Sequence, residues 1–152
     1  MSTITAMKIY FSCSLTGGRN DQPVYAAIVE FLLAAGHEVL TAALARPEVL
    51  DVEAAVSPNN VYDRDVAWVQ GCDVLVAEVS TPSHGVGYEI ALALNLGKPV
   101  LCVYRTGARV SKMILGNRSP GLVIFAYTAM PHLLAELSKF LGERSGGLSG
   151  GI

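Results

Sequence analysis

Residues 73–89 have the sequence DVLVAEVSTPSHGVGYE, in which an apolar run of strand length leads into small and hydroxyl-bearing residues. The continuous apolar character of Val74-Leu75-Val76-Ala77 predicts a strand that is covered on both faces, as in a parallel sheet. A segment of helical periodicity follows, from Val86 to Gly97. A strand, a glycine-containing loop and a helix in this order are typical of one unit of an α/β fold.

The same alternation of strand and helix extends along the chain in both directions. Asp73 to Val79 and four similar runs predict five strands, the others being Lys8 to Ser12, Glu38 to Thr41, Pro99 to Tyr104 and Leu122 to Phe125. Helices are predicted at about Asp21 to Gly36, Asn60 to Gly71, Val86 to Gly97, Val110 to Leu115 and Met130 to Leu141. The pattern predicts a doubly wound, five-stranded parallel sheet, in which ligands bind beyond the carboxyl ends of the strands.

Length and composition narrow the classes of function. The chain has 152 residues, of which 51% are hydrophobic and 16% charged, so one domain is expected over residues 1–141. The glycine-rich residues 142–152 are expected to form a flexible tail. A net charge of −2 with scattered basic residues disfavours binding to a nucleic acid polymer. No apolar run approaches the roughly 18 residues of a membrane span, so we expect a soluble cytoplasmic protein, with a nuclear location also compatible.

The sequence also argues against common metal and cofactor sites. The three cysteines, Cys13, Cys72 and Cys102, lack the spacing of zinc ligands and do not suggest a disulfide framework. The GxGxxG fingerprint of a dinucleotide site is absent. We therefore predict a protein without a metal ion or another cofactor.

Two loops at the expected ligand-binding edge carry small residues. The loop after the first strand is Ser12-Cys13-Ser14-Leu15-Thr16-Gly17-Gly18-Arg19, and the loop after the third strand leads through Ser83, Gly85 and Gly87 into a helix. Hydroxyls and backbone N–H groups in such loops can bind a phosphate near a helix N-terminus. An ordinary glycine-rich turn is the alternative interpretation of the first loop.

Glu89 is a charged residue on the apolar arc of the helix predicted to begin at Val86, where it falls between Ala93 and Leu96. Charged side chains are rarely turned inward without a partner or a task. In the first helical turn, the helix dipole would favour the ionised carboxylate, which is the form that a nucleophile requires. The alternative is a structural carboxylate held by a hydroxyl or an arginine.

Asp65 presents the same anomaly on the preceding helix. It lies within an inward stripe formed by Val61, Trp68 and Cys72. Arg64 is predicted to point away from this stripe. Two inward carboxylates that reach one crevice from different helices suit glycosyl transfer, in which one attacks the anomeric carbon and the other protonates the leaving group. A helix cap or a salt bridge is the alternative role for Asp65.

Tyr10 points from the first strand toward the same crevice, where its hydroxyl could hold a carboxylate in position; a core tyrosine is the alternative. The three histidines, His37, His84 and His132, have no identified partner and are interpreted as local rather than catalytic. The residues alone therefore support a pair of carboxylates with a tyrosine, without fixing the reaction.

Several of these segments together form a family pattern. They are Tyr10-Phe11-x-x-Ser14-x-x-Gly17-Gly18-Arg19, Asp65-x-x-Trp68, Ala77-Glu78-Val79 and Pro82-Ser83-x-Gly85-Val86-Gly87-Tyr88-Glu89. In order and spacing, over residues 8 to 141, they resemble the 2′-deoxynucleoside 5′-phosphate N-hydrolases, the Rcl-type members of the nucleoside 2-deoxyribosyltransferase superfamily. The segment from Gly85 to Glu89 is the most specific part of the resemblance.

The resemblance implies a flavodoxin-like fold with strand order 2-1-3-4-5, a homodimer and a double displacement that needs no metal. It makes Glu89 the nucleophile that forms a deoxyribosyl ester, Asp65 the acid that protonates the departing base, and Tyr10 the residue that orients the site. Water would then release 2-deoxyribose 5-phosphate from the ester. The implied substrate is a small molecule, a 2′-deoxynucleoside 5′-monophosphate.

The resemblance also implies a set of substrate-binding residues. They are Cys13, Ser14, Leu15, Thr16, Gly17, Gly18, Arg19, Ile28, Ser83, Gly85, Gly87, Ser111 and Met113. Ser14, Ser83 and the glycine backbone of the first loop would hold the 5′-phosphate. Ser111, with Met113 beside it, would reach the phosphate bound by the partner subunit. Ile28 matches an apolar residue near the base.

Two positions affect the expected substrate. The family usually has an arginine at the position of Thr16, which leaves the base preference open. Relatives that hydrolyse CMP or hydroxymethyl-CMP tend to carry phenylalanine at the position of Tyr10, so Tyr10 favours a 2′-deoxy sugar. Three alternatives remain: a transferase that exchanges bases on deoxyribose, a CMP-type ribonucleotide N-hydrolase, and a nucleotide-binding module without activity.

Overall fold

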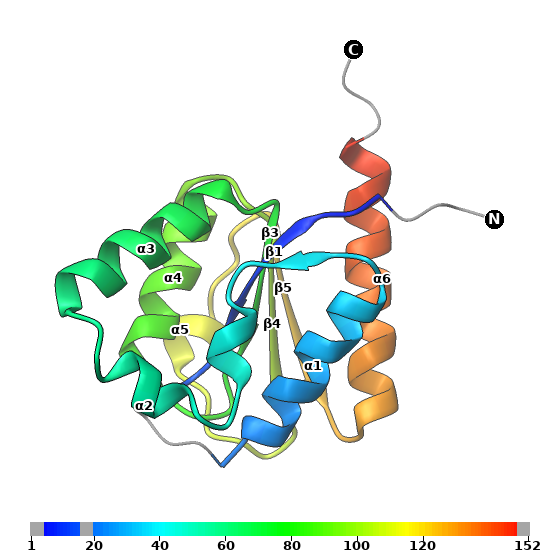
Figure 1. Cartoon of the computed structure of the whole chain (residues 1–152). Helices are drawn as coiled ribbons and strands as arrows, with labels where there is room; N and C mark the ends of the chain where they lie inside the picture. The colour runs from blue at the N-terminus through cyan, green and yellow to red at the C-terminus, as the bar shows by residue number, and fades with distance from the viewer. Residues whose placement is uncertain (1–4, 16–19, 149–152) are drawn as a thin grey trace.

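The computed structural model describes residues 5–15 and 20–148. At its centre is a sheet of five parallel strands in the order β2-β1-β3-β4-β5 (Figure 1). The strands are β1 (Lys8–Ser12), β2 (Glu38–Val39), β3 (Val74–Glu78), β4 (Val100–Arg105) and β5 (Leu122–Tyr127). The predicted doubly wound parallel sheet and its strand order are confirmed.

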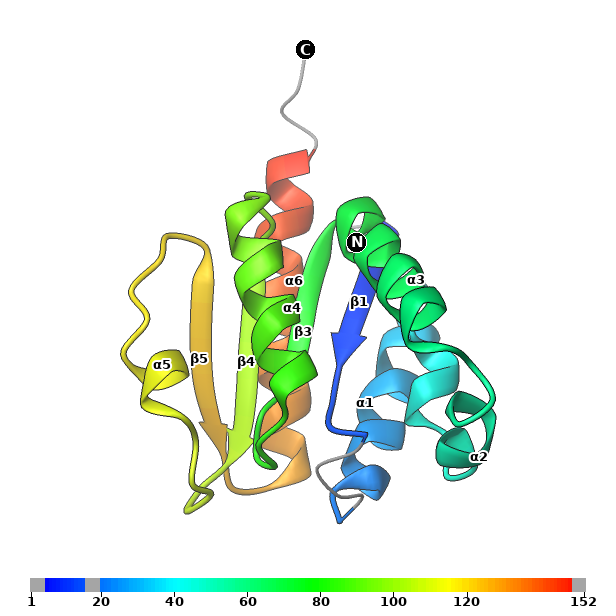
Figure 2. The same cartoon turned by 90° about the vertical axis from the view of Figure 1, so that its left-hand side faces the viewer.

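Helices cover both faces of the sheet. On one face lie α1 (Gln22–Ala34) and α6 (Met130–Leu148), and on the other lie α3 (Pro58–Gly71) and α4 (His84–Asn95), as Figures 1 and 2 show. The short helix α5 (Lys112–Leu115) precedes β5. None of the helices in the described ranges combines the length and the apolar character of a bilayer-spanning segment.

The sheet separates two apolar cores, because the side chains of a strand point alternately to its two faces. Ile9 and Phe11 of β1 belong to the core beneath α1 and α6, whereas Tyr10 belongs to the core beneath α3 and α4. The same alternation turns Ser12 toward the α3 and α4 face. Tyr10 and Ser12 are therefore neighbours on one side of β1.

Hydroxyl caps set the starts of the two helices on this face. Ser57 Oγ accepts a backbone N–H of the first turn of α3 at 3.3 Å, and Pro58 occupies the start of that turn. Ser83 Oγ accepts the N–H of Val86 at 3.3 Å. Because Ser83 is the cap, α4 begins at His84, two residues before the start that the periodicity predicts.

The helix ends follow the prediction on α1 and α4 but not on α6. Gly36 and Gly97 follow α1 and α4 with φ of 92° and 75°, a conformation that ends a helix at little cost for glycine. The helix α6 continues to Leu148, past the predicted end at Leu141. Arg144 contributes to this extension, because its guanidinium lies 4.1 Å from the centre of the Phe140 ring.

The segment between β2 and α3 contains two short helices that the sequence pattern does not predict. They are the 3₁₀-helix η1 (Ala42–Ala45) and the helix α2 (Val49–Glu53). Neither has a side-chain cap, and both are too short to display helical periodicity. Gln22 Nε2 ties η1 to α1 by donating to the carbonyl oxygen of Ala45 at 2.8 Å.

A buried polar network lies at the end of β3, on the face of the sheet that α1 and α6 cover. The fully buried Glu78 accepts hydrogen bonds from the backbone N–H of Ser80 at 2.6 Å, from Ser80 Oγ at 3.0 Å and from the Tyr127 hydroxyl. Burial raises the pKa of Glu78, and these donors act in the opposite direction. Ser80 Oγ also accepts the backbone N–H of Arg105 at 2.8 Å. The network thereby ties the loop after β3 to β4 and β5.

A second link holds the same loop. Arg105 forms an ion pair with the buried Asp21, and Thr81 Oγ1 donates to Asp21 Oδ2 at 2.9 Å. Asp21 directly precedes α1, so this link joins the start of α1, the end of β4 and the loop after β3. The loop that carries Ser83 is therefore anchored on the face opposite α4.

Replacing Tyr127 by phenylalanine should lower the free energy of unfolding by about 1–3 kcal/mol, because Glu78 would lose a donor where water cannot replace it. Denaturant unfolding followed by circular dichroism measures this change. Tyr104→Phe on β4 is the matched control, since the Tyr104 hydroxyl makes no hydrogen bond within residues 5–15 and 20–148. Equal losses in the two variants would contradict a role for the Tyr127 hydroxyl.

Candidate active site

A cavity of about 650 Å³ lies between α2, α3 and α4 and the loops that follow β1 and β3. Its position agrees with the rule that parallel sheets bind ligands beyond the carboxyl ends of their strands. The walls are mostly apolar, and the acidic residues on them are Glu53, Asp65 and Glu89. No group of side chains that could hold a metal ion forms among residues 5–15 and 20–148.

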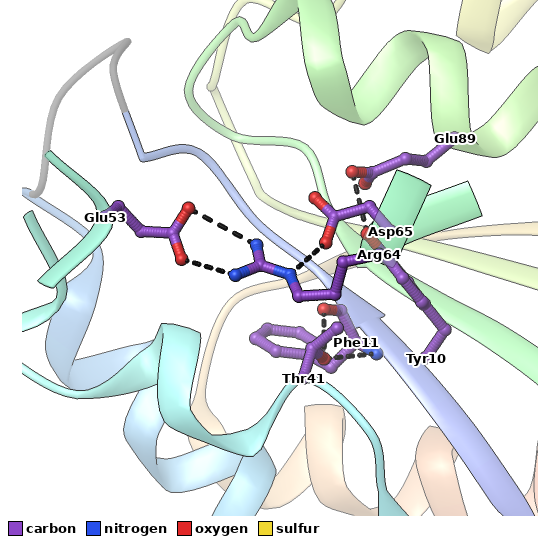
Figure 3. A network of polar contacts seen from close by, with 7 residues as sticks. All are labelled: Tyr10, Phe11, Thr41, Glu53, Arg64, Asp65 and Glu89. Atoms are coloured by element: carbon purple, nitrogen blue, oxygen red, sulfur yellow. Dashed lines mark hydrogen bonds and ion pairs between the residues drawn. The ribbon is translucent and has the colours of Figure 1, made fainter. Parts of the chain in front are cut away.

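Two hydroxyls from β1 hold the Glu89 carboxylate. The Tyr10 hydroxyl donates to Glu89 Oε1 at 2.8 Å (Figure 3), and Ser12 Oγ donates to Glu89 Oε2 at 2.5 Å. Tyr10 and Ser12 reach Glu89 together because they occupy alternate positions of one strand. Both carboxylate oxygens are thus oriented by the sheet rather than by the helix that carries Glu89.

The groups around Glu89 have opposing effects on its pKa. Burial raises the pKa of Glu89, and the nearby Asp65 raises it further, while the hydrogen bonds from Ser12 and Tyr10 lower it. Burial also raises the pKa of Tyr10 far above its ordinary value, with the charges of Glu89 and Asp65 adding to the effect. The Tyr10 hydroxyl therefore stays protonated and acts as a donor.

The prediction that Glu89 lies in the first turn of its helix is wrong. Because Ser83 caps α4 and the helix begins at His84, Glu89 is its sixth residue. The field of a helix terminus weakens beyond the first turn, so the dipole contributes little to the ionisation of Glu89. The hydroxyls of Tyr10 and Ser12 supply the stabilisation that the sequence prediction attributes to the dipole.

Asp65 faces the same cavity from α3, and its neighbour Arg64 does not point away as predicted. Arg64 Nε donates to Asp65 Oδ1 at 2.8 Å, while Arg64 Nη1 and Nη2 lie 2.8 and 3.3 Å from the two oxygens of Glu53 (Figure 3). Burial raises the pKa of Asp65, and the hydrogen bond and charge of Arg64 act in the opposite direction. Asp65 is therefore a partly buried carboxyl with one oxygen bound to a cation.

The predicted phosphate loops lie next to this pair, as far as they are described. Cys13 and Leu15 line the cavity from the first loop, and Ser83 and Gly85 line it at the start of α4. Ser14 is fully buried beside them. The predicted binding residues Thr16, Gly17, Gly18 and Arg19 lie outside the described residues.

Five predicted binding residues that the structure describes do not line the cavity, the buried Ser14 among them. Ile28 is fully buried in the core beneath α1 and α6, because α1 packs on the face of the sheet opposite α3 and α4. Gly87, Ser111 and Met113 line a second hollow of about 570 Å³ beside α4 and α5. The structure therefore does not bring Ile28 to the cavity, and it brings Ser111 and Met113 only to the neighbouring hollow.

A comparison with protein families identifies the chain. The family model described as nucleoside 2-deoxyribosyltransferase matches residues 9–138, which include Tyr10, Asp65 and Glu89. The chain belongs to the nucleoside 2-deoxyribosyltransferase family. The resemblance stated from the sequence motifs is thereby confirmed.

Relatives within this family carry N-hydrolase names. A Methanococcoides burtonii protein named among the 2′-deoxynucleoside 5′-phosphate N-hydrolases is 43% identical over 111 residues, which cover 73% of this chain and 91% of that protein. The 5-hydroxymethyl-dUMP N-hydrolase of Rattus norvegicus is 46% identical over 112 residues, covering 71% and 68% of the two chains.

Solved structures show the same fold. The CMP N-glycosidase of Clostridium botulinum superimposes with a TM-score of 0.63 at 18% identity, over 86% of this chain and 98% of that one. A conserved protein from Enterococcus faecalis superimposes with a TM-score of 0.56 at 19% identity, over 89% and 99% of the two chains. At this identity the likeness supports the family fold alone.

Three residues of this candidate site are not predicted from the sequence. Ser12 is predicted at the end of the first strand and the start of a loop and is given no role, although its distance of two residues from Tyr10 on the strand places it on the same face. Glu53 belongs to the unpredicted helix α2, so no pattern indicates its place. The helical wheel describes where Arg64 leaves the helix and not where its long side chain ends.

Replacing Ser12 by alanine should raise the pKa of Glu89, because the lost hydrogen bond stabilises the ionised form. A ¹³C NMR titration of the labelled Glu89 carboxyl measures the change. Ser57→Ala, which removes the cap hydroxyl of α3, is the control. An unchanged Glu89 titration in Ser12→Ala would show that this hydroxyl does not stabilise the carboxylate.

Proposed function

We propose that this chain hydrolyses the N-glycosidic bond of 2′-deoxynucleoside 5′-monophosphates, releasing the free base and 2-deoxyribose 5-phosphate. The observation that carries the proposal is the meeting of Glu89 and Asp65 on one cavity wall, with Glu89 held by two hydroxyls. N-glycosidic hydrolysis also agrees with the names of the relatives that are 43% and 46% identical.

In the first step, a Glu89 oxygen attacks the anomeric carbon of the sugar. The bond from that carbon to the base nitrogen breaks, its electron pair stays with the base, and Asp65 transfers its proton to the base. Tyr10 and Ser12 fix the attacking carboxylate, and each Glu89 oxygen keeps a lone pair beyond the hydrogen bond it accepts. The product of this step is a deoxyribosyl ester of Glu89.

In the second step, water attacks the same carbon from the side that the base has left. The ionised Asp65 takes a proton from the water, and the bond between the anomeric carbon and the Glu89 oxygen breaks. Glu89 leaves as a carboxylate and Asp65 regains its proton, so both groups return to their starting states. The raised pKa of Asp65 suits a group that alternates between acid and base.

The phosphate would bind where the first loop meets α4. Ser83 is both the cap of α4 and part of the cavity wall, and Gly85 lies beside it in the first turn. A helix N-terminus offers free N–H groups and a positive field to a phosphate. The base would lie between α2, α3 and α4, where the wall is apolar and includes Leu50, Val56 and Val61.

We also propose a homodimer in which Ser111 reaches the phosphate of the partner subunit. Ser111 and Met113 line the second hollow rather than the cavity with Glu89, so a role at the phosphate within one copy finds no support. Met113 is 85% exposed, an apolar side chain suited to cover by a second copy. Ser83 and Val86 line both the cavity and the second hollow, so the two are adjacent. This adjacency supports a position of Ser111 near the phosphate of the partner subunit.

The reaction is tested with a panel of deoxy- and ribonucleoside monophosphates and deoxynucleosides, each assayed for free base and sugar phosphate. The unaltered protein should release both from deoxynucleotides. Glu89→Gln should lower kcat by at least roughly 10³-fold, because the amide cannot form the ester. Glu30→Gln, an exposed change on α1, is the control.

Each other outcome identifies another function. Base exchange on deoxynucleosides with untouched monophosphates would indicate a transferase, and faster cleavage of CMP would indicate a ribonucleotide N-hydrolase. Tight nucleotide binding without free base would indicate a module without activity. Normal turnover in Glu89→Gln would exclude Glu89 as the nucleophile.

The contribution across the dimer predicts complementation between two impaired variants. Glu89→Gln lacks the nucleophile, and Ser111→Glu should repel the phosphate. Mixed dimers restore one complete site if Ser111 acts on the partner, since the intact Glu89 then receives an intact Ser111. Activity after subunit exchange should rise to about one quarter of the unaltered rate, whereas no gain would place Ser111 outside the partner's site.

A further inference from the structure

We propose that Arg64 is a positioning residue for Asp65, turning one oxygen of that carboxyl toward the departing base; this inference rests on the proposed function. Arg64 does not line the cavity, so it acts through Asp65 rather than on the substrate. The residue is held on three sides, by Asp65, Glu53 and Trp68.

The contacts of Arg64 leave its guanidinium little freedom. Its Nη1 and Nη2 form a fork with the two Glu53 oxygens, and its Nε donates to Asp65 Oδ1. The guanidinium carbon also lies 4.9 Å from the centre of a Trp68 ring. Because each of the three guanidinium nitrogens donates to a carboxylate, Arg64 is held in place and restrains the rotation of the Asp65 carboxyl.

This fixation distinguishes the two oxygens of Asp65. Oδ1 accepts the N–H of Arg64, so the proton of the neutral carboxyl belongs on Oδ2. Figure 3 shows this second oxygen on the side of Glu89, where the reacting sugar would lie. Arg64 thereby determines which oxygen donates the proton, and a misplaced donor is costly to a proton transfer.

The charges around Asp65 come from four elements. Glu53 of α2 and Glu89 of α4 are acidic, Tyr10 of β1 is a protonated hydroxyl, and Arg64 is the cation. Burial raises the pKa of Asp65, Arg64 lowers it and Glu53 raises it. Removing the cation should therefore raise the pKa of Asp65 further.

The test compares substrates that differ in their need for an acid. The base of 7-methyl-dGMP already carries a positive charge and departs without a proton, whereas dGMP needs one. For pyrimidines, 5-nitro-dUMP has a better leaving group than dUMP. Whichever pair the unaltered protein hydrolyses faster is used with Arg64→Gln.

If Arg64 positions the acid, Arg64→Gln should lower kcat/KM for the acid-dependent substrate by roughly 10–100-fold and for its activated partner by less than about threefold, because kcat/KM reports the departure of the base and not the later attack of water. On the alkaline side of the pH profile, the loss of activity should occur at a higher pH in Arg64→Gln, because the raised pKa keeps Asp65 protonated to a higher pH. Arg64→Lys, which can bind one carboxylate but not both, should recover part of the lost kcat/KM.

Arg144→Gln is the matched control, because Arg144 also bonds a neighbouring acid, Glu143, and also lies over an aromatic ring, that of Phe140. It should leave both substrates and the pH profile unchanged. Equal losses on both substrates in Arg64→Gln, or an unshifted pH profile, would overturn the positioning role and leave a purely structural one. Failure of the unaltered protein on both substrate pairs would instead overturn the proposed function, and this inference with it.

Discussion

The candidate site depends on one carboxylate held by two hydroxyls of one strand. Because side chains alternate along β1, Tyr10 and Ser12 both face α4, and each donates to a different oxygen of Glu89. Tyr10 is 1% exposed, so core packing fixes its ring and thereby the position of its hydroxyl. The sheet, which is the most constrained part of the molecule, sets the direction in which Glu89 points.

Two glutamates, Glu78 and Glu89, lie on opposite faces of the sheet and differ in their surroundings. Glu78 is fully buried and accepts hydrogen bonds from Ser80 and Tyr127. These bonds make Glu78 an anchor for the loop after β3. Glu89 accepts bonds from two hydroxyls and borders a cavity of about 650 Å³, a volume suited to a nucleotide. Burial raises the pKa of both carboxyls. Access to a cavity, and not the raised pKa, therefore separates a candidate nucleophile from a structural anchor.

The parts that the sequence predicts correctly are those with strong periodicity. The five strands and the inward position of Asp65 follow from apolar runs and helical faces, whereas the strand order follows from the family resemblance. The start of α4 depends on a hydrogen bond of Ser83, and a periodicity cannot show which hydroxyl is the cap. Glu53 lies on an uncapped helix of five residues, where no pattern can accumulate. The reach of Arg64 depends on a tertiary partner, which a helical wheel leaves out.

The cavity is built from parts of unequal rigidity. Glu89 and Asp65 belong to long helices that pack on the sheet, whereas the wall opposite them is formed by α2, which lacks a side-chain cap, and by the residues that follow it. This wall is tied to α3 by the pair of Arg64 and Glu53. A base placed against it would meet the least constrained surface of the cavity, while the sugar would meet the most constrained one. Changes in α2 at positions other than Glu53 can therefore alter which base would fit without moving the two proposed catalytic carboxylates.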